Sequence, residues 1–253
     1  MLKRTGRETC WRIHSPHRHA RRLMMLRDIA IANIILSILL AGWSILDVRR
    51  RPPHMSVMKW VWPLTFLWGG LFALAMYLGF GRAPAKDASD HHEHGQAYGH
   101  MQHAFWQSVA LGATHCGAGC SLADILVESG IFILGLNLVV LGHAVFGNWI
   151  IDYVAALMTG VIFQYAALAP MSDAPRAMVW QQAFKSDVLS LSSWQIGMYG
   201  WMAICIFVLF GHARMHPDHW LFWWMMQVAM LCGFLSAYPT NWALIRAGVK
   251  EAM

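Results

Sequence analysis

The stretch AFWQSVALGATHCGAGCSLADILVESGIFILGLNLVVLGHAVF, residues 104–146, decides the fold. It is apolar over most of its length, yet its middle, THCGAGCSLADILVE (114–128), contains side chains that hydrocarbon solvates poorly. These are His115, Cys116, Cys120, Asp124 and Glu128. A helix rises about 1.5 Å per residue, and about 20 apolar residues cross a bilayer core. The stretch is therefore too long for one span.

The same stretch offers a place for the chain to break. Gly117 and Gly119 loosen the backbone, and Ser121 followed by Asp124 is typical of a helix N-terminus with a capping box. We therefore expect two spans here, at about 104–119 and 122–146, with a break near Gly117–Ser121.

The rest of the chain has the composition of a membrane protein. Of its 253 residues 57% are hydrophobic and 13% are charged, whereas about a quarter of a soluble domain is charged. Five further apolar runs lie at 29–46, 60–80, 149–169, 189–210 and 220–238. We expect an all-α fold, a polytopic transmembrane helical bundle of about seven spans. The alternative is six spans with the run at 104–119 re-entrant.

The charge pattern divides the chain and predicts its orientation. A basic leader (1–27) precedes the first two transmembrane helices (28–80), a His-rich loop (81–103) and a helical core (104–253) that carries the HCxxxC motif. Lys and Arg crowd the connection 47–59 and recur in the C-terminal tail, so with seven spans both lie in the cytoplasm and the His-rich loop faces outward. The leader then also lies outside, unless translation starts at Met24 or Met25. The basic excess suits anionic lipid and gives no sign of nucleic-acid binding.

Four side chains of the central stretch recur every four residues. On a continuous helix Cys116, Cys120, Asp124 and Glu128 form one ridge. If a helix instead restarts at Ser121, Cys120 lies just before its N-terminus, where thiolate is favoured. Thiolates with an imidazole suit Cu(I), zinc or iron, so we predict a metal site. The alternative is close helix packing around small residues, with the acids at the membrane surface.

Two further patterns could bind metal. The His-rich loop contains His91, His92, His94, His100 and His103. A short His-rich tract is a metal-binding composition, although it is also compatible with a solvated connector. Met198 and Met202 share a helix face with Cys205, and thioethers bind Cu(I), although a single Met is more often a core filler.

Three further acidic or basic residues lie in or near the apolar runs. Asp152, near the start of the run 149–169, is the candidate for a buried partner in a cation path. Lys185 and Asp187 are expected to form an ion pair at the membrane interface.

Several short motifs of the chain resemble those of a known family. They are VWPLT (61–65), HCGAGCSLADI (115–125), FQYAALAPM (163–171), KSDVLSL (185–191), IGMYGWM (196–202) and the tail YPTNW…GVKEAM. From about residue 60 to 253 the chain resembles an uncharacterised bacterial multi-pass membrane family, domain of unknown function 4396. The residues on its patterned positions are His115, Cys116, Cys120, Asp124, Gln164, Lys185 and Asp187. Ala123 replaces the usual glycine. The resemblance implies a multi-pass helical fold in a bacterial plasma membrane and no established activity.

The sequence is compatible with three functions. The first is a transition-metal-binding membrane protein, with copper as first choice and zinc as second, that moves, holds or delivers the ion. The second is a membrane thiol–disulfide oxidoreductase using Cys116 and Cys120, although such pairs are usually CxxC and a helical four-residue spacing suits a disulfide poorly. The third is a non-catalytic assembly subunit, because no complete catalytic motif is present. A homo-oligomer or a larger membrane complex would accommodate any of them.

Overall fold

A computed structural model describes residues 16–53, 55–83, 104–136, 138–210 and 215–250. In chain order its helices are α1 (Pro16–Arg50), α2 (Met58–Met76), η1 (Tyr77–Gly81), α3 (Phe105–Leu134), α4 (Ala144–Leu168), η3 (Ala169–Met171), α5 (Arg176–Ala203), η4 (Ile204–Leu209) and α6 (Trp220–Arg246). Over these described residues six helices are long and apolar enough to cross a membrane. The all-α, multi-pass class is confirmed, and the expected count of about seven is close.

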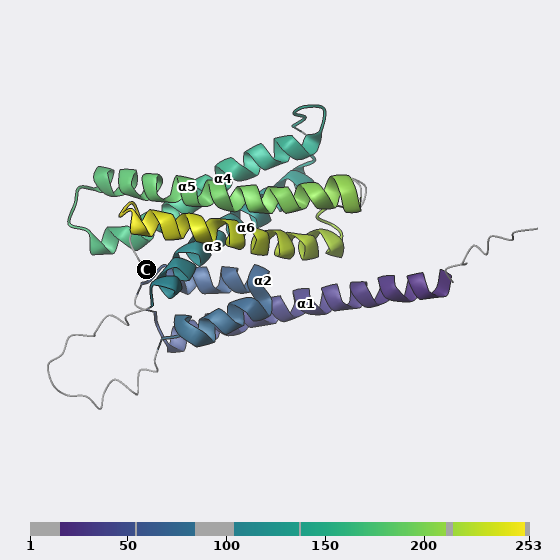
Figure 1. Cartoon of the computed structure of the whole chain (residues 1–253), viewed down its shortest axis with the longest axis horizontal. Coiled ribbons are helices and arrows are strands. Elements are labelled where there is room, and N and C mark those ends of the chain that lie inside the picture. The colour runs from purple at the N-terminus through teal and green to yellow at the C-terminus, as the bar shows by residue number, and fades with distance from the viewer. Residues whose placement is uncertain (1–15, 54, 84–103, 137, 211–214, 251–253) are drawn as a thin grey trace, which may run out of the picture.

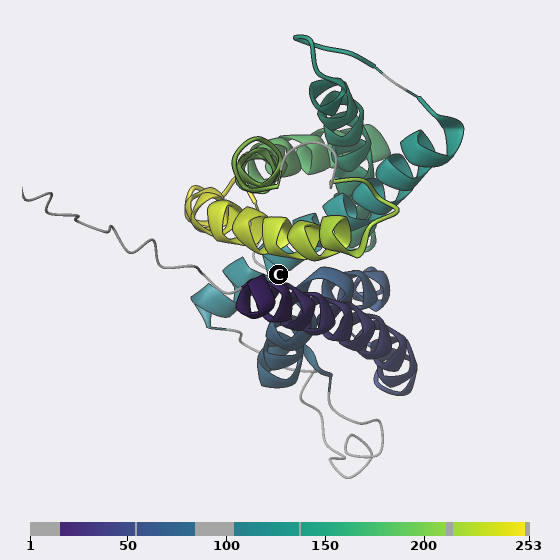
Figure 2. The same cartoon turned by 90° about the vertical axis from the view of Figure 1, so that its right-hand side faces the viewer.

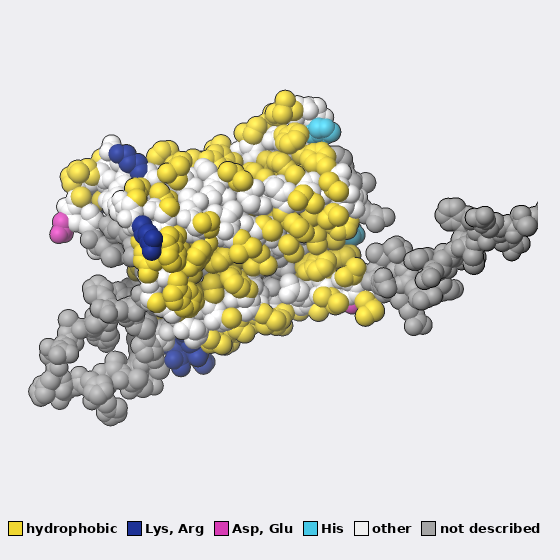
Figure 3. All heavy atoms as spheres, in the orientation of Figure 1, with side chains coloured by type: hydrophobic (Ala, Val, Ile, Leu, Met, Phe, Trp, Pro, Cys, Tyr) yellow, Lys and Arg dark blue, Asp and Glu magenta, His cyan; other side chains and the backbone are white. Residues whose placement is uncertain are grey.

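The helices form two parts. Helices α3 to α6 pack as an antiparallel bundle, and α1 and α2 cover one side of it (Figures 1 and 2). The two parts meet through buried aromatic rings such as Trp68 and Trp194, whose centroids are 5.4 Å apart. Hydrophobic side chains cover the visible face of the molecule, and Lys and Arg gather at its left end (Figure 3). We call this the basic end; an apolar face bounded by charge suits a bilayer.

The expected break in the central stretch is wrong. Helix α3 runs without interruption for 30 residues, about 45 Å at 1.5 Å per residue. The two glycines give room for neighbouring helices instead of breaking the chain. A Cβ on Gly117 would clash with the Trp194 ring, and one on Gly119 would lie 3.0 Å from the Gly160 Cα. Small residues of this kind let membrane helices approach closely.

The chain reverses in α2. Gly70 has φ +47° and ψ −120°, a conformation that non-glycine residues rarely adopt. Beyond it the chain returns along itself, because the rings of Trp62 and Tyr77 are 4.9 Å apart. Gly81 also lies directly against Trp62. Met58 and Gly81 therefore lie at the same end of the molecule, and α2 with η1 forms a re-entrant helical hairpin (Figure 1). This segment is one of the six that are long and apolar enough to cross, but it returns to the side from which it enters.

Polar side chains stabilise the apex of this hairpin. The Gln227 side chain of α6 donates to the Leu67 carbonyl at 2.7 Å, and Asn33 of α1 donates to Gln227 at 2.9 Å. A broken helix at membrane depth needs such partners, because lipid offers none. The re-entrant segment is thus the run 60–80, whereas the sequence suggested the run 104–119.

The hairpin changes which segments share a side. Asp47, near the end of α1, pairs with Arg82 at 2.6 Å. The Phe80 and Trp106 rings are 5.5 Å apart, and Arg246 lies over the Phe105 ring. Both flanks of the His-rich loop therefore lie at the basic end, beside the end of α6. This arrangement disagrees with the expectation that the loop and the C-terminal tail face opposite sides.

Candidate functional site

The four-residue ladder on α3 is a buried ridge. Cys116 and Cys120 are fully buried, Asp124 is 2% exposed and Glu128 is 9% exposed. Because α3 is continuous, the ridge geometry is confirmed, and the placement of Cys120 before a helix N-terminus is wrong. The ridge faces α4, α5 and α6, which supply polar partners at two levels.

The first level is the N-terminal polar cluster, formed by Cys116, Asp187, Ser190, Asn241 and Lys250. The Cys116 thiol donates to Asp187 Oδ1 at 3.0 Å and contacts Ser190 Oγ at 3.1 Å. Lys250 Nζ donates to Cys116 Sγ at 3.2 Å and lies 3.6 Å from Asp187 Oδ1. Asn241 Nδ2 donates to Ser190 Oγ at 2.7 Å. One carboxylate and one ammonium thus meet around a thiol.

Lys250 completes this cluster from beyond the end of α6. Burial alone would lower its pKa, but interaction with Cys116 and Asp187 outweighs burial, so the pKa of Lys250 is raised and the side chain stays an ammonium. The expected pair of Lys185 with Asp187 is wrong, since Lys185 is exposed on α5 while Asp187 is buried against Lys250. No local spacing in the sequence signals this contact, because 63 positions separate the two partners.

His115 lies beside the ridge and apart from its thiols. The ring is fully buried and faces Phe163, with centroids 6.1 Å apart. Among the described residues its nitrogens have no hydrogen-bond partner of good geometry, although the Phe163 backbone lies close. Neighbouring helix positions point about 100° apart. His115 and Cys116 therefore do not converge as the sequence suggested.

The second level is the acidic cluster, formed by Asp124, Glu128, Asp152 and Tyr199. The Tyr199 hydroxyl donates to Asp152 Oδ2 at 2.8 Å and contacts the Trp149 carbonyl at 2.9 Å. Asp124 lies next to Asp152, but neither of its oxygens has a hydrogen-bond partner of good geometry among the described residues. The expectation of a buried Asp152 is confirmed. Carboxylates this close need a proton or a cation to neutralise them.

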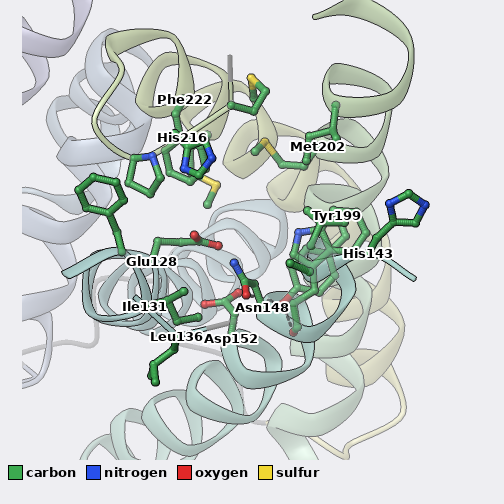
Figure 4. Close-up of a pocket in the computed structure, with 18 of the residues that line it drawn as sticks. Glu128, Ile131, Leu136, His143, Asn148, Asp152, Tyr199, Met202, His216 and Phe222 are labelled. Carbon is green, nitrogen blue, oxygen red and sulfur yellow. Dashed lines mark hydrogen bonds between the residues drawn. The ribbon is translucent and has the colours of Figure 1, made fainter. Parts of the chain in front are cut away.

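The acidic cluster opens into a pocket of about 390 Å³ at the end opposite the basic end. Figure 4 shows Glu128, Asn148 and Asp152 pointing toward the same space, with Met202 and His216 on the opposite wall. The soft ligands that line it are Met198, Met202, Met215, Met226, His143 and His216. Thioethers and imidazoles on the wall, with carboxylates on the floor, form a donor set that suits a soft cation.

The structure therefore divides the residues predicted to bind metal. It brings Glu128, Met198 and Met202 to one pocket and holds Cys116 in a separate hydrogen-bonded cluster. Within the described part of the chain, no three His, Cys, Asp or Glu side chains converge as a metal site. All four described cysteines are free thiols. The imidazoles of the His-rich loop, His91 to His103, lie outside the described residues.

The comparisons with known proteins agree with this architecture. The family described as a domain of unknown function (DUF4396) matches residues 105–250, more than half of the chain. The chain belongs to this family. The DUF4396 match begins at the first residue of α3 and ends at Lys250, so it contains both polar clusters and excludes α1 and α2. The motif VWPLT (61–65) therefore lies outside the matched residues. No curated protein and no solved structure matches the chain.

Proposed function

We propose that this DUF4396 protein takes a transition-metal cation, copper as first choice and zinc as second, into the membrane through the pocket above the acidic cluster. The single observation that supports this is the lining of that pocket. Four thioethers and two imidazoles surround it, while Glu128 and Asp152 supply negative charge at its floor. Thioethers favour Cu(I) and bind hard ions weakly.

The ridge on α3 gives the cation a direction of movement. From the pocket floor, Glu128 and Asp124 lead one turn at a time to Cys120 and then to Cys116. A route made of successive small ligand sets releases its ion more readily than a closed cage does. This favours transport or delivery over storage.

The orientation follows from the basic residues. Arg49 and Arg50 end α1, Arg51 follows them, and Arg246 ends α6 at the same end of the bundle. The positive-inside rule supports a cytoplasmic basic end, and we propose that the protein lies in a bacterial plasma membrane with its pocket facing outward. The basic residues in the first turns of α1, which include Arg18 and Arg27, lie at the pocket end and oppose this orientation.

Copper binding tests the proposal. The full-length protein is purified in detergent after copper supplementation under reducing conditions, and its copper content per chain is measured. We expect near-integer copper in the wild type and at least a tenfold weaker affinity in a Met198→Leu/Met202→Leu variant. That variant keeps the side-chain volume but removes two sulfur ligands. Met230→Leu, buried in α6 outside the pocket, is the matched control.

A second variant separates the pocket from the cysteines. Cys116→Ser/Cys120→Ser should leave copper bound at the pocket and slow its movement into proteoliposomes. Loss of all bound copper in the cysteine variant, with none lost in the methionine variant, would place the site at the thiols. A metal-free wild type would refute metal handling altogether. Reversible oxidation of the two thiols with quinone would then favour the oxidoreductase.

A further inference from the structure

The N-terminal polar cluster contains an ammonium that comes from a short tail. After α6 the chain turns at Gly248, whose φ of +69° suits glycine, and the Lys250 amide donates to the Leu244 carbonyl at 3.3 Å. This turn directs Lys250 back into the bundle, where its side chain is fully buried. Lys250, the fourth residue after α6, thus inserts a positive charge into a site made by three helices.

Two oxygens of the cluster have unused hydrogen-bonding capacity. Asp187 Oδ2 and Asn241 Oδ1 are buried without a hydrogen-bond partner among the described residues. Asn241 and Lys250 meet beside Gly112, where a Cβ would lie 3.7 Å from Asn241 Oδ1 and 3.8 Å from Lys250 Cε. The Lys250 stem and Asn241 Oδ1 therefore flank the same glycine, and the ammonium makes no hydrogen bond to this acceptor. Orphan acceptors of this kind are costly inside a protein, and water or a bound cation can satisfy them.

We propose that this cluster is a binding site for a monovalent cation and that the Lys250 ammonium is its tethered occupant. When the tail withdraws, a carboxylate, an amide oxygen, a hydroxyl and a thiol remain around the vacated space. One carboxylate balances one positive charge, so a monovalent ion restores neutrality and a divalent ion leaves an excess. The oxygens suit an alkali ion, and the thiol adds affinity for a soft ion such as Cu(I).

The site would close the cytoplasmic end of the ridge. A cation that reaches Cys116 meets the Lys250 ammonium, and the two compete for Asp187. Displacement of the tail toward the basic end would then release the ion on that side. The proposal uses none of the pocket residues, so it goes beyond the proposed function and can hold or fail separately from copper binding.

The test measures the thermal midpoint of the full-length protein in detergent. Sodium, potassium and silver, the last as a Cu(I) surrogate, are each compared with N-methylglucamine, an organic cation too bulky for the site. The variants are Lys250→Ala, Lys250→Gln and Lys250→Ala/Asp187→Asn. Arg246→Ala is the matched control, because Arg246 is basic and ends the same helix but stacks on Phe105 and Trp242.

We expect Lys250→Ala and Lys250→Gln to melt below the wild type in N-methylglucamine and to regain about 5–10 °C, saturably, at about a hundredfold excess of the right cation over its Kd. The wild type and Arg246→Ala should show no such gain, and Asp187→Asn should abolish it. A gain with sodium or potassium identifies an alkali-ion site, whereas a gain with silver alone identifies a soft-ion site.

Three results would overturn the proposal. The first is that folded Lys250 variants show no thermal shift with any cation. The second is a thermal shift that survives Asp187→Asn. The third is that Lys250 variants do not fold and that no cation restores their folding. The first and third results would leave the ammonium as only a structural partner of Asp187, and the second would mean that the cation binds outside this cluster. The copper content of the same Lys250 variants shows whether the pocket still works, so a failure here is distinguishable from a failure of the proposed function.

Discussion

The two polar clusters on α3 lie on one face of one helix and solve the burial of charge in opposite ways. The N-terminal polar cluster pairs one carboxylate with one ammonium and links them through a thiol, a hydroxyl and an amide. The acidic cluster holds three carboxyl groups, and within the described residues a single tyrosine hydroxyl donates to them. The charges of the first cluster balance each other, whereas the charges of the second balance only with a proton or a cation. This difference supports the proposals that the acidic cluster captures a cation and that the N-terminal polar cluster closes the route.

The largest loss of stability should come from breaking the ion pair between Asp187 and Lys250. Asp187→Asn leaves the Lys250 ammonium uncompensated in the bundle, which should cost about 3–5 kcal/mol of stability. Thermal or denaturant unfolding in detergent measures the loss. Lys185→Gln, an exposed position on the same helix, should change stability by less than about 0.5 kcal/mol. An Asp187→Asn variant as stable as wild type would show that the pair does not form.

A smaller loss of stability should follow when the Asp187 carboxylate is kept but pushed out of its position. A Cβ at Gly160 would lie 2.6 Å from Asp187 Oδ2 and 2.5 Å from Leu191 Cδ1, so Gly160→Ala should cost about 1–3 kcal/mol. Gly130 lies in α3 with nothing within 4 Å of its Cβ position, and Gly130→Ala should stabilise by up to about 1 kcal/mol. Equal effects at the two positions would contradict the packing around Asp187.

Neutralising a carboxyl group of the acidic cluster should raise stability, whereas neutralising Asp187 should lower it. Asp152→Asn removes one of the adjacent carboxyl groups and keeps an oxygen that accepts from Tyr199, so stability should rise by about 1 kcal/mol. Unfolding measured beside Asp187→Asn gives the comparison directly. We also expect weaker copper binding, since the floor of the pocket loses negative charge. A destabilised Asp152→Asn protein would mean that this carboxyl already has a partner.

The smallest effect should come from the tyrosine of the acidic cluster. Tyr199→Phe removes the hydroxyl that contacts Asp152 and the Trp149 carbonyl, which should cost about 0.5–1.5 kcal/mol. Tyr165→Phe provides the control, because the Tyr165 ring stacks on Trp180 outside both clusters. A difference of less than about 0.3 kcal/mol between the two variants would remove Tyr199 from the cluster's energetics.

The sequence by itself determined the class of the fold and the ridge. Long apolar runs predict membrane helices, and side chains four apart share a helix face wherever that helix lies. Cys116, Cys120, Asp124 and Glu128 therefore appear together in the structure as the spacing predicted. The common face of Met198 and Met202 was readable in the same way, and both line the pocket. Periodicity is a local property, so it survives without knowledge of the neighbouring helices.

Only the tertiary structure decided where the chain reverses and which charges meet. Gly117 and Gly70 are both glycines in apolar runs, yet Gly117 makes room for Trp194 inside a straight helix while Gly70 turns a hairpin. The partner of Asp187 is Lys250 on the far tail and not Lys185 two residues away. A glycine permits several conformations, and a buried charge accepts any opposite charge within reach. In both cases the choice depends on distances between helices, which no local pattern in the chain records.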